Sequence, residues 1–137
     1  MNKTQALTNW SENKIAEIVF QAGLKVHRSL GPGLLESAYE ACLFYELEQY
    51  EFLVERQVKL PIIYEEVKLD AGYCIDLLID KRVVIELKAV ESIHPVHTAQ
   101  IITYLKLSDC KLGLLINFNT TLFKNGFKRI INGNLEE

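Results

Sequence analysis

Two ionisable side chains, Glu86 and Lys88, stand two residues apart in an otherwise apolar segment, VVIELKAV (residues 83–90). The apolar run predicts a strand, and side chains alternate between the two faces of a strand. Glu86 and Lys88 would therefore point the same way. Taken alone, such a pair is typical of a solvated acid–base pair on a half-exposed strand, because short motifs of this kind often occur by chance.

A second carboxylate changes that interpretation. Asp76 lies within the preceding apolar run, YCIDLLID (residues 73–80). If residues 80–82 form the turn, Ile79 faces Val83, and the same register places Asp76 directly opposite Glu86 on a shared face. A two-residue turn would instead place the two carboxylates on opposite faces. The prediction therefore depends on the length of the loop.

Converging carboxylates require a positive charge or a shared proton. Two unit charges ~4 Å apart repel by about 4 kcal/mol at an effective dielectric constant near 20. Lys88 supplies one positive charge, whereas a hard divalent ion such as Mg²⁺ or Mn²⁺ supplies two and prefers oxygen ligands. The alternative is an ionic cluster of Asp76, Glu86 and Lys88 without metal. A zinc pair at His94 and His97 is disfavoured, because no cysteine or second histidine pair is suitably placed.

Predicted helices offer further polar groups. Gly33, Glu36 and Tyr39 are spaced by three, which places Glu36 and Tyr39 on adjacent turns of one helical face. Glu36 could serve a site or simply stabilise the helix dipole in the first turn. Gln100 and Tyr104 lie one turn apart on a later helix and could face the same site, or they could form the polar shoulder of an amphipathic helix.

These groups must be positioned by a mixture of helices and strands. A helix that joins Ala89 to a strand at Lys111 permits a parallel crossover, so we expect an α/β sandwich with a central mixed β-sheet flanked by helices. Hydrophobic periodicity and turn residues predict helices over 12–30 (with Ser11 as N-cap), 34–50 and 95–107, and strands over 52–64, 67–90, 111–118 and 126–131. Residues 65–66 predict a turn, residues 70–72 a kink or second turn, and residues 80–82 a break between strands.

Length and composition indicate one globular domain. The 137 residues are 49% hydrophobic and 24% charged, values typical of soluble domains. We expect residues 1–11 to be loose and residues 12–133 to form a single domain. The formal net charge of −3 excludes a histone-like polycation and a solvating acidic tail. The C-terminal third is locally basic and could present a modest phosphate-binding face, through Lys106, Lys124, Lys128 and Arg129.

Cysteine usage and hydropathy point to the cytoplasm. The three cysteines are far apart and form no C-x-x-C pair, which argues against a disulfide framework and a thiolate zinc site. The N-terminus has no hydrophobic leader-like run. No apolar stretch reaches the roughly 18 residues that a spanning helix needs, so we expect no membrane partner.

In their joint order and spacing, these motifs resemble the GxxExxY protein family, which is grouped with the PD-(D/E)xK nuclease superfamily. The similarity extends from about residue 13 to residue 129 and rests on Gly33-x-x-Glu36-x-x-Tyr39, the Asp76 strand, Glu86-Leu87-Lys88, and Gln100 with Tyr104. The segments VERQV, IELKAV, HTAQIITYLKLS and LGLLINF are also similar to the family. The resemblance implies a restriction-endonuclease-like α-β-β-β-α-β core, in agreement with the predicted order of elements.

The resemblance also implies a role for each motif residue. Asp76 and Glu86 would bind Mg²⁺ or Mn²⁺, helped by the backbone carbonyl of Leu87. Lys88 would orient the attacking water or stabilise the pentavalent phosphate. Glu36 would touch a metal-bound water or Lys88, as a further candidate metal ligand. The helix residues Gln100 and Tyr104 would complete the catalytic set.

The sequence thus favours a metal-dependent nuclease that hydrolyses phosphodiester bonds in nucleic acid. Because no reader motif is present, specificity would be low or supplied by a second copy or a protein partner. The main alternative is a non-catalytic module that keeps the fold and binds nucleic acid or protein. A hydrolase of small phosphorylated metabolites is less favoured, because Gly31-Pro32-Gly33 lacks the lysine of a phosphate-binding loop.

Overall fold

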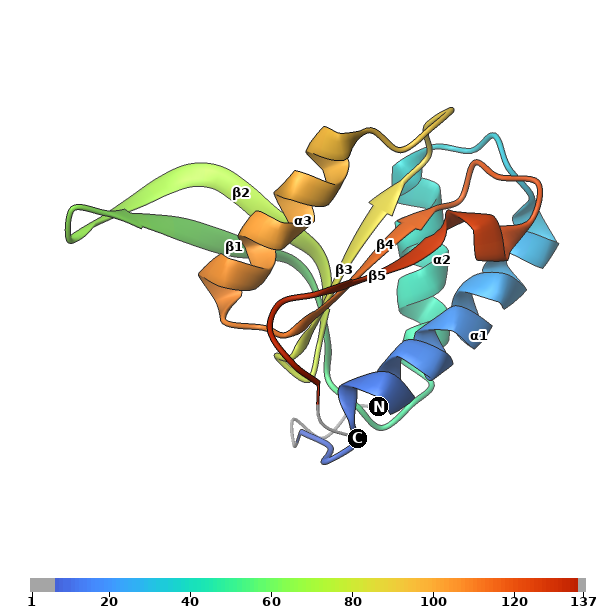
Figure 1. Cartoon of the computed structure of the whole chain (residues 1–137). Helices are drawn as coiled ribbons and strands as arrows, with labels where there is room; N and C mark the ends of the chain where they lie inside the picture. Colours follow the sequence, from blue (N-terminus) through green and yellow to red (C-terminus); the bar gives the residue numbers. More distant parts are fainter. Residues whose placement is uncertain (1–6, 136–137) are drawn as a thin grey trace.

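The computed structural model describes residues 7–135 and shows an α/β fold with three α-helices and a five-stranded mixed sheet (Figure 1). This is the predicted fold class. In chain order, the elements are α1 (Glu12–Leu30), α2 (Glu36–Leu47), β1 (Val54–Tyr64), β2 (Val67–Ile79), β3 (Val83–Lys88), α3 (Pro95–Ser108), β4 (Leu112–Asn117), the short 3₁₀ helix η1 (Phe123–Gly126) and β5 (Phe127–Ile131).

The strands follow the order β1-β2-β3-β4-β5 across the sheet. Only β3 and β4 are parallel, and α3 forms the crossover between them; the other neighbours are antiparallel. The predicted parallel crossover is therefore confirmed. It matters for function because it brings α3 over the face of β3 that carries the polar side chains.

The two faces of the sheet bury separate cores. Helices α1 and α2 cover one face and α3 covers the other (Figure 1). Ile85 of β3 belongs to the core under α1 and α2, whereas the next strand residue towards the turn, Val84, packs in the core under α3. The alternation predicted for this strand is thus present, and it directs Glu86 and Lys88 towards the α3 side.

Helix α2 begins and ends inside the predicted 34–50. Its later start follows from the loop before it, which is held in an extended form. Gly33 has φ 100°, a left-handed value that favours glycine. The hydroxyl of Tyr39 donates to the carbonyl of Gly31 (2.5 Å) and accepts from the backbone N–H of Leu34 (3.2 Å). These two bonds hold the loop against the first turn of the helix, so regular helix begins only at Glu36.

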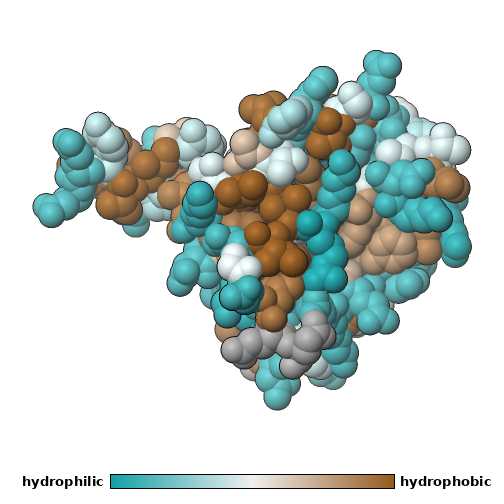
Figure 2. Space-filling model, viewed as in Figure 1, coloured by the Kyte–Doolittle hydropathy of each residue, from teal (hydrophilic) through white to brown (hydrophobic). Residues whose placement is uncertain are grey.

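Strands β1 and β2 form a long twisted ribbon that projects beyond the rest of the sheet (Figure 1). The predicted break at residues 70–72 is a kink and not a turn: β2 continues through it, Gly72 has φ 79°, and the pairing shifts between Leu60 and Ile62. Towards its tip the ribbon exposes large side chains, including Tyr64 (63% exposed) and Val67 (54%). Figure 2 shows brown, hydrophobic surface on this ribbon.

The N-terminal segment meets the core before α1 begins. Residues 1–6 of the segment predicted to be loose lie outside the described residues. In its second part, the backbone N–H of Thr8 donates to a carboxylate oxygen of Asp80 (3.2 Å), and the Trp10 ring packs edge-on against Phe52. Among residues 7–135, no helix combines the length and apolarity needed to cross a membrane.

Candidate active site

The register between β2 and β3 decides where Asp76 lies. Residues 80–82 form the connection, and the pairs Ile79 with Val83 and Leu77 with Ile85 follow it. The register predicted for the longer turn is therefore confirmed. One residue further along, Asp76 lies across from Glu86.

At this point the two strands stop exchanging backbone hydrogen bonds and use side chains instead. The backbone N–H of Asp76 donates to Oε1 of Glu86 (3.2 Å), and the backbone N–H of Leu87 donates to Oδ2 of Asp76 (2.9 Å). Each carboxylate thus takes the place of a backbone carbonyl as the hydrogen-bond acceptor between the two strands. The exchange fixes both acids to the main chain where the strands separate.

The environment of Glu86 strongly favours its protonated form. Burial, the negative charge of Asp76 and a hydrogen bond with the side chain of Asp76 together raise the pKa of Glu86 from 4.5 to about 9, and burial is the largest of these causes. The charge of Lys88 lowers the pKa but does not offset the other effects. Only 5% of Glu86 is exposed. A buried carboxyl group of this kind ionises readily only when a cation joins it.

Lys88 lies at the end of β3 and is connected to α3. Its ammonium group donates to Oε1 of Gln100 (3.4 Å), and Nε2 of Gln100 donates to the hydroxyl of Tyr104 (3.1 Å). Tyr104 is buried, and this burial, with the nearby charge of Glu86, raises the pKa of its phenol. The predicted set of Lys88, Gln100 and Tyr104 is thus a continuous hydrogen-bonded chain beside the two carboxylates.

The alternative of a metal-free ionic cluster is not what the structure contains. In the described part of the chain, no ion pair joins Lys88 to Asp76 or Glu86. The lysine is turned towards Gln100, so it leaves the repulsion between the two acids largely uncompensated.

The donor set fits a small hard cation in its chemistry. Asp76 and Glu86 offer carboxylate oxygens, the ligands that Mg²⁺ and Mn²⁺ prefer. No group of three or more His, Cys, Asp or Glu side chains within residues 7–135 is arranged to hold a metal ion. Asp76 and Glu86 would therefore form a two-carboxylate site, completed by backbone carbonyl or water oxygens.

Helix α2 reaches this region through a residue that the sequence did not single out. Glu36 is exposed in the first turn of α2. One turn later, Glu40 accepts from Nε2 of Gln57 (2.8 Å), and the same nitrogen donates to Oδ1 of Asp76 (3.2 Å). The four-residue spacing from Glu36 was a usable signal for Glu40. No sequence pattern marked Gln57.

The end of β3 is anchored by its parallel neighbour. The buried side chain of Asn117 accepts from the backbone N–H of Val90 (3.1 Å) and donates to the carbonyl of Val90 (2.9 Å). The backbone N–H of Phe118 donates to the carbonyl of Lys88 (2.9 Å), and Tyr39 stacks on the Phe118 ring with centroids 4.5 Å apart. The backbone that carries Lys88 is therefore firmly held.

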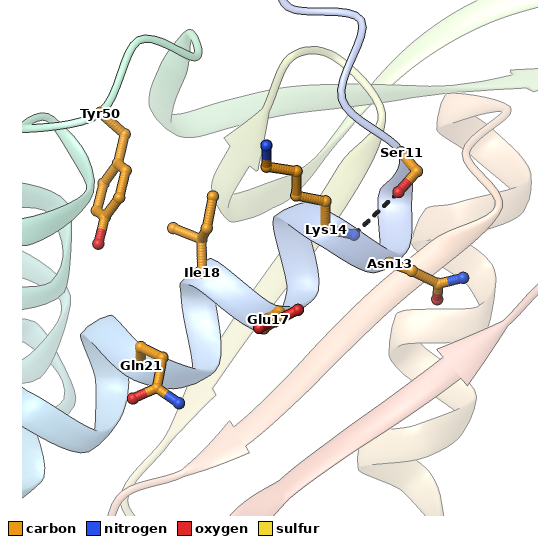
Figure 3. Close-up of a pocket in the computed structure, with 7 residues that line it drawn as sticks. All are labelled: Ser11, Asn13, Lys14, Glu17, Ile18, Gln21 and Tyr50. Atoms are coloured by element: carbon orange, nitrogen blue, oxygen red, sulfur yellow. Dashed lines mark hydrogen bonds between the residues drawn. The ribbon is translucent and has the colours of Figure 1, made fainter. Parts of the chain in front are cut away.

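A shallow groove adjoins the site on the α3 side. Its wall includes Gln100 and Tyr104, and the partly exposed ring of Tyr73 meets Tyr104 edge-on, with centroids 6.0 Å apart. A separate hollow lies at the start of α1, where Lys14 donates its backbone N–H to Ser11 (Figure 3). That hollow contains none of the predicted site residues; its lining is Ser11, Asn13, Lys14, Glu17, Ile18, Gln21 and Tyr50.

The predicted basic residues do not form one patch. Lys128 and Arg129 are neighbours on β5, so they point to opposite faces of the sheet. Lys128 pairs with Leu115 of the α3-side core, whereas Arg129 pairs with Leu114 of the other core and bonds to Asn13 of α1. The exposed residue Lys106 lies on α3, and Lys124 lies on η1.

The two neighbouring histidines have a structural role at the start of α3. Nδ1 of His97 accepts from the backbone N–H of His94 (3.1 Å), and the two residues form a reciprocal capping box. This arrangement satisfies backbone donors at the helix end. It explains the His-x-x-His spacing without a zinc ion.

Comparison with known protein families gives a match over most of the chain. A sequence model described as the PD-(D/E)XK nuclease superfamily matches residues 13–130. The match includes all the residues of the candidate site. Searches of curated proteins and of solved structures found no match.

Proposed function

Since the chain belongs to the PD-(D/E)XK nuclease superfamily, we propose that it is a metal-dependent nuclease whose active site is formed by Asp76, Glu86 and Lys88. The observation that carries the proposal is the facing pair of acids at the point where β2 and β3 separate. Lys88 forms no ion pair with either acid, and burial, together with the charge and hydrogen bond of Asp76, raises the pKa of Glu86 to about 9. Such a strongly perturbed group beside a groove is a mark of functional sites.

Asp76 and Glu86 would hold Mg²⁺ or Mn²⁺, with the backbone carbonyl of Leu87 as a third oxygen ligand. A divalent ion supplies a more acidic water and compensates charge that develops on a phosphodiester. The protein's part is to keep both carboxylates fixed through their bonds to the backbone. Glu36, at the exposed start of α2, is a further candidate ligand through water.

Lys88 would act by charge. Its ammonium group is free of ion pairs to the two acids and is held by Gln100, so it can face a phosphate oxygen where negative charge appears in the transition state. Tyr104 fixes the amide of Gln100 through its hydroxyl group. Gln100 and Tyr104 thus orient the lysine, and they also line the groove that would receive the substrate.

The proposal is tested by a cleavage assay. Purified protein is incubated with supercoiled plasmid, single-stranded DNA and RNA, each with Mg²⁺, Mn²⁺ or EDTA. We expect metal-dependent cutting that Lys88→Ala and Glu86→Ala abolish. Lys25→Ala is the matched control, because Lys25 pairs with Glu46 on the far helices. Cutting by either site variant at the wild-type rate would refute the assigned site.

Four finer features belong to the same proposal. The spacing of Gly33, Glu36 and Tyr39 supports membership of the GxxExxY branch, and residues 12–133 would act as one domain. The three cysteines are free thiols, as is usual for proteins of the reducing cytoplasm. The partner is nucleic acid, with a second copy or another protein supplying specificity.

Two observations favour a second candidate function, a non-catalytic binding module. The basic residues are divided between the two faces of the sheet, and the net charge is −3, so nonspecific attraction to phosphates is weak. A folded protein that cuts none of the three substrates with either metal, yet is captured by one of them, would support this alternative.

A further inference from the structure

Gln57 has a backbone conformation that is unusual for a strand residue. It lies within β1, between the pairs Arg56 with Leu77 and Val58 with Ile75, and therefore opposite Asp76. Its φ is 49°, in the left-handed region. A residue other than glycine adopts this region at a cost, and such strain gathers where function requires it.

The unusual φ changes which face each side chain of β1 occupies. Val54 packs in the core under α1 and α2, but Val58, an even number of residues later, packs against the core under α3. Regular alternation would keep them on one face. β2 changes face at the same level, since Leu77 belongs to the first core and Ile75 to the second. The reversal is centred on Gln57 and Asp76.

One consequence is that two consecutive side chains reach the same carboxylate. Arg56 donates to Oε2 of Glu40 through Nε (3.2 Å) and Nη2 (3.1 Å), and Gln57 donates to Oε1 through Nε2 (2.8 Å). Consecutive residues of a regular strand would point apart. Glu40, whose side chain is 12% exposed, is thereby locked in place by both neighbours.

The other consequence is at Asp76. The nitrogen that bonds Glu40 also donates to Oδ1 of Asp76 (3.2 Å), while the backbone N–H of Leu87 holds Oδ2 (2.9 Å). A glutamine amide has two hydrogens, and both are used. Both oxygens of Asp76 are thus restrained, one from β1 and one from β3. The amide does this without adding a positive charge that would compete with a cation.

We propose that Gln57 is a positioning residue for the metal site: held by Glu40 and by its left-handed backbone, its amide orients the carboxylate of Asp76. This role rests on the proposed function, in which Asp76 is a metal ligand. Partners that orient a ligand typically contribute about 10–100-fold to metal affinity.

The test separates the effect of the side-chain amide of Gln57 from the effect of its strained backbone. Glycine adopts a φ of 49° without strain, so Gln57→Gly keeps the backbone and removes the amide. Glu66→Gly is the matched control, because Glu66 is another strained non-glycine residue, with φ 67°, at the tip of the β1–β2 ribbon. Mn²⁺ affinity is measured by calorimetry on each full-length variant, after its folding is checked by cooperative thermal melting.

We expect Gln57→Gly to raise the Kd for Mn²⁺ by about 10–100-fold, and Glu66→Gly to leave it unchanged. Cleavage by Gln57→Gly should recover as the Mn²⁺ concentration is raised, which a general loss of structure would not allow. An NMR spectrum gives a readout that does not depend on activity. The side-chain amide resonance of Gln57 is assigned as the one missing from the Gln57→Gly spectrum, and Mg²⁺ should shift it in the wild-type protein.

The outcomes distinguish this role from the proposed function. If Asp76→Asn abolishes Mn²⁺ binding but Gln57→Gly binds as wild type does, the role of Gln57 is wrong and the metal site stands. If wild-type protein binds no Mn²⁺, or binds it equally well with Asp76→Asn, the metal site itself is wrong and the role of Gln57 falls with it.

Discussion

The carboxylate of Glu86 on β3 accepts a hydrogen bond from the backbone N–H of Asp76 on β2. In return, the carboxylate of Asp76 accepts one from the backbone N–H of Leu87, the residue that follows Glu86. The acids are therefore anchored to the main chain and cannot swing apart to relieve their repulsion. A proton on Glu86 relieves it instead, as the pKa of about 9 indicates. Binding a cation would release that proton, so metal affinity and pH are linked.

This linkage predicts how stability varies with pH in EDTA. The folded protein keeps a proton on Glu86 that the unfolded chain loses near its ordinary pKa of 4.5. The free energy of unfolding should therefore fall as pH rises from 4.5 towards about 9, by at most about 1.4 kcal/mol per pH unit. Urea unfolding over this range measures it. Glu86→Gln, which stays neutral, should have a flatter profile; an equal slope in both proteins would contradict the prediction.

Asp76→Asn should have opposite effects with and without metal. Asp76→Asn should raise the melting temperature in EDTA, because the charge of Asp76 no longer opposes the ionisation of Glu86. The rise in melting temperature that Mn²⁺ gives to the wild type should disappear, because a ligand is lost. Thermal melts in EDTA and in Mn²⁺ measure both effects. Asp70→Asn, on the exposed ribbon, should retain the full Mn²⁺ response; a retained response in Asp76→Asn would exclude Asp76 as a ligand.

Gln100→Leu should lower kcat by about 10–100-fold with a smaller change in KM, a range typical of residues that orient a functional group. The amide oxygen of Gln100 accepts from the Lys88 ammonium group, and leucine cannot replace that bond. Steady-state cleavage kinetics give the two constants. Gln49→Leu, the same substitution at an exposed glutamine just beyond α2, should leave both unchanged. Wild-type kcat in Gln100→Leu would show that Lys88 needs no such partner.

Tyr39→Phe should affect stability and leave chemistry intact. It removes the hydroxyl that bonds Gly31 and Leu34 but keeps the ring stacked on Phe118. The expected loss is about 1–3 kcal/mol in the free energy of unfolding, measured by urea unfolding. Tyr45→Phe, on the exposed face of α2 (64% exposed), should cost much less. A loss of cleavage without a loss of stability would instead give Tyr39 a direct part in the reaction.

The sequence was sufficient for most of the fold and for the central site. Helix α1 has the predicted bounds, and α3 ends one residue beyond its prediction, because hydrophobic periodicity and caps are local properties of the chain. The sequence could also predict that Asp76 lies opposite Glu86. It depends only on alternation along two strands and on the length of the turn between them.

Tertiary structure decided the rest, for reasons that no local pattern contains. Gln57 reaches Asp76 because its φ is positive and because Glu40, 17 residues earlier, approaches from α2. The pKa of Glu86 depends on burial under α3 and on the charge of a neighbouring strand. Hydrophobic periodicity indicates which side of one segment is buried and which side is exposed to solvent. Only the packed chain sets which groups from separate segments share a site, and therefore which charges remain without compensation.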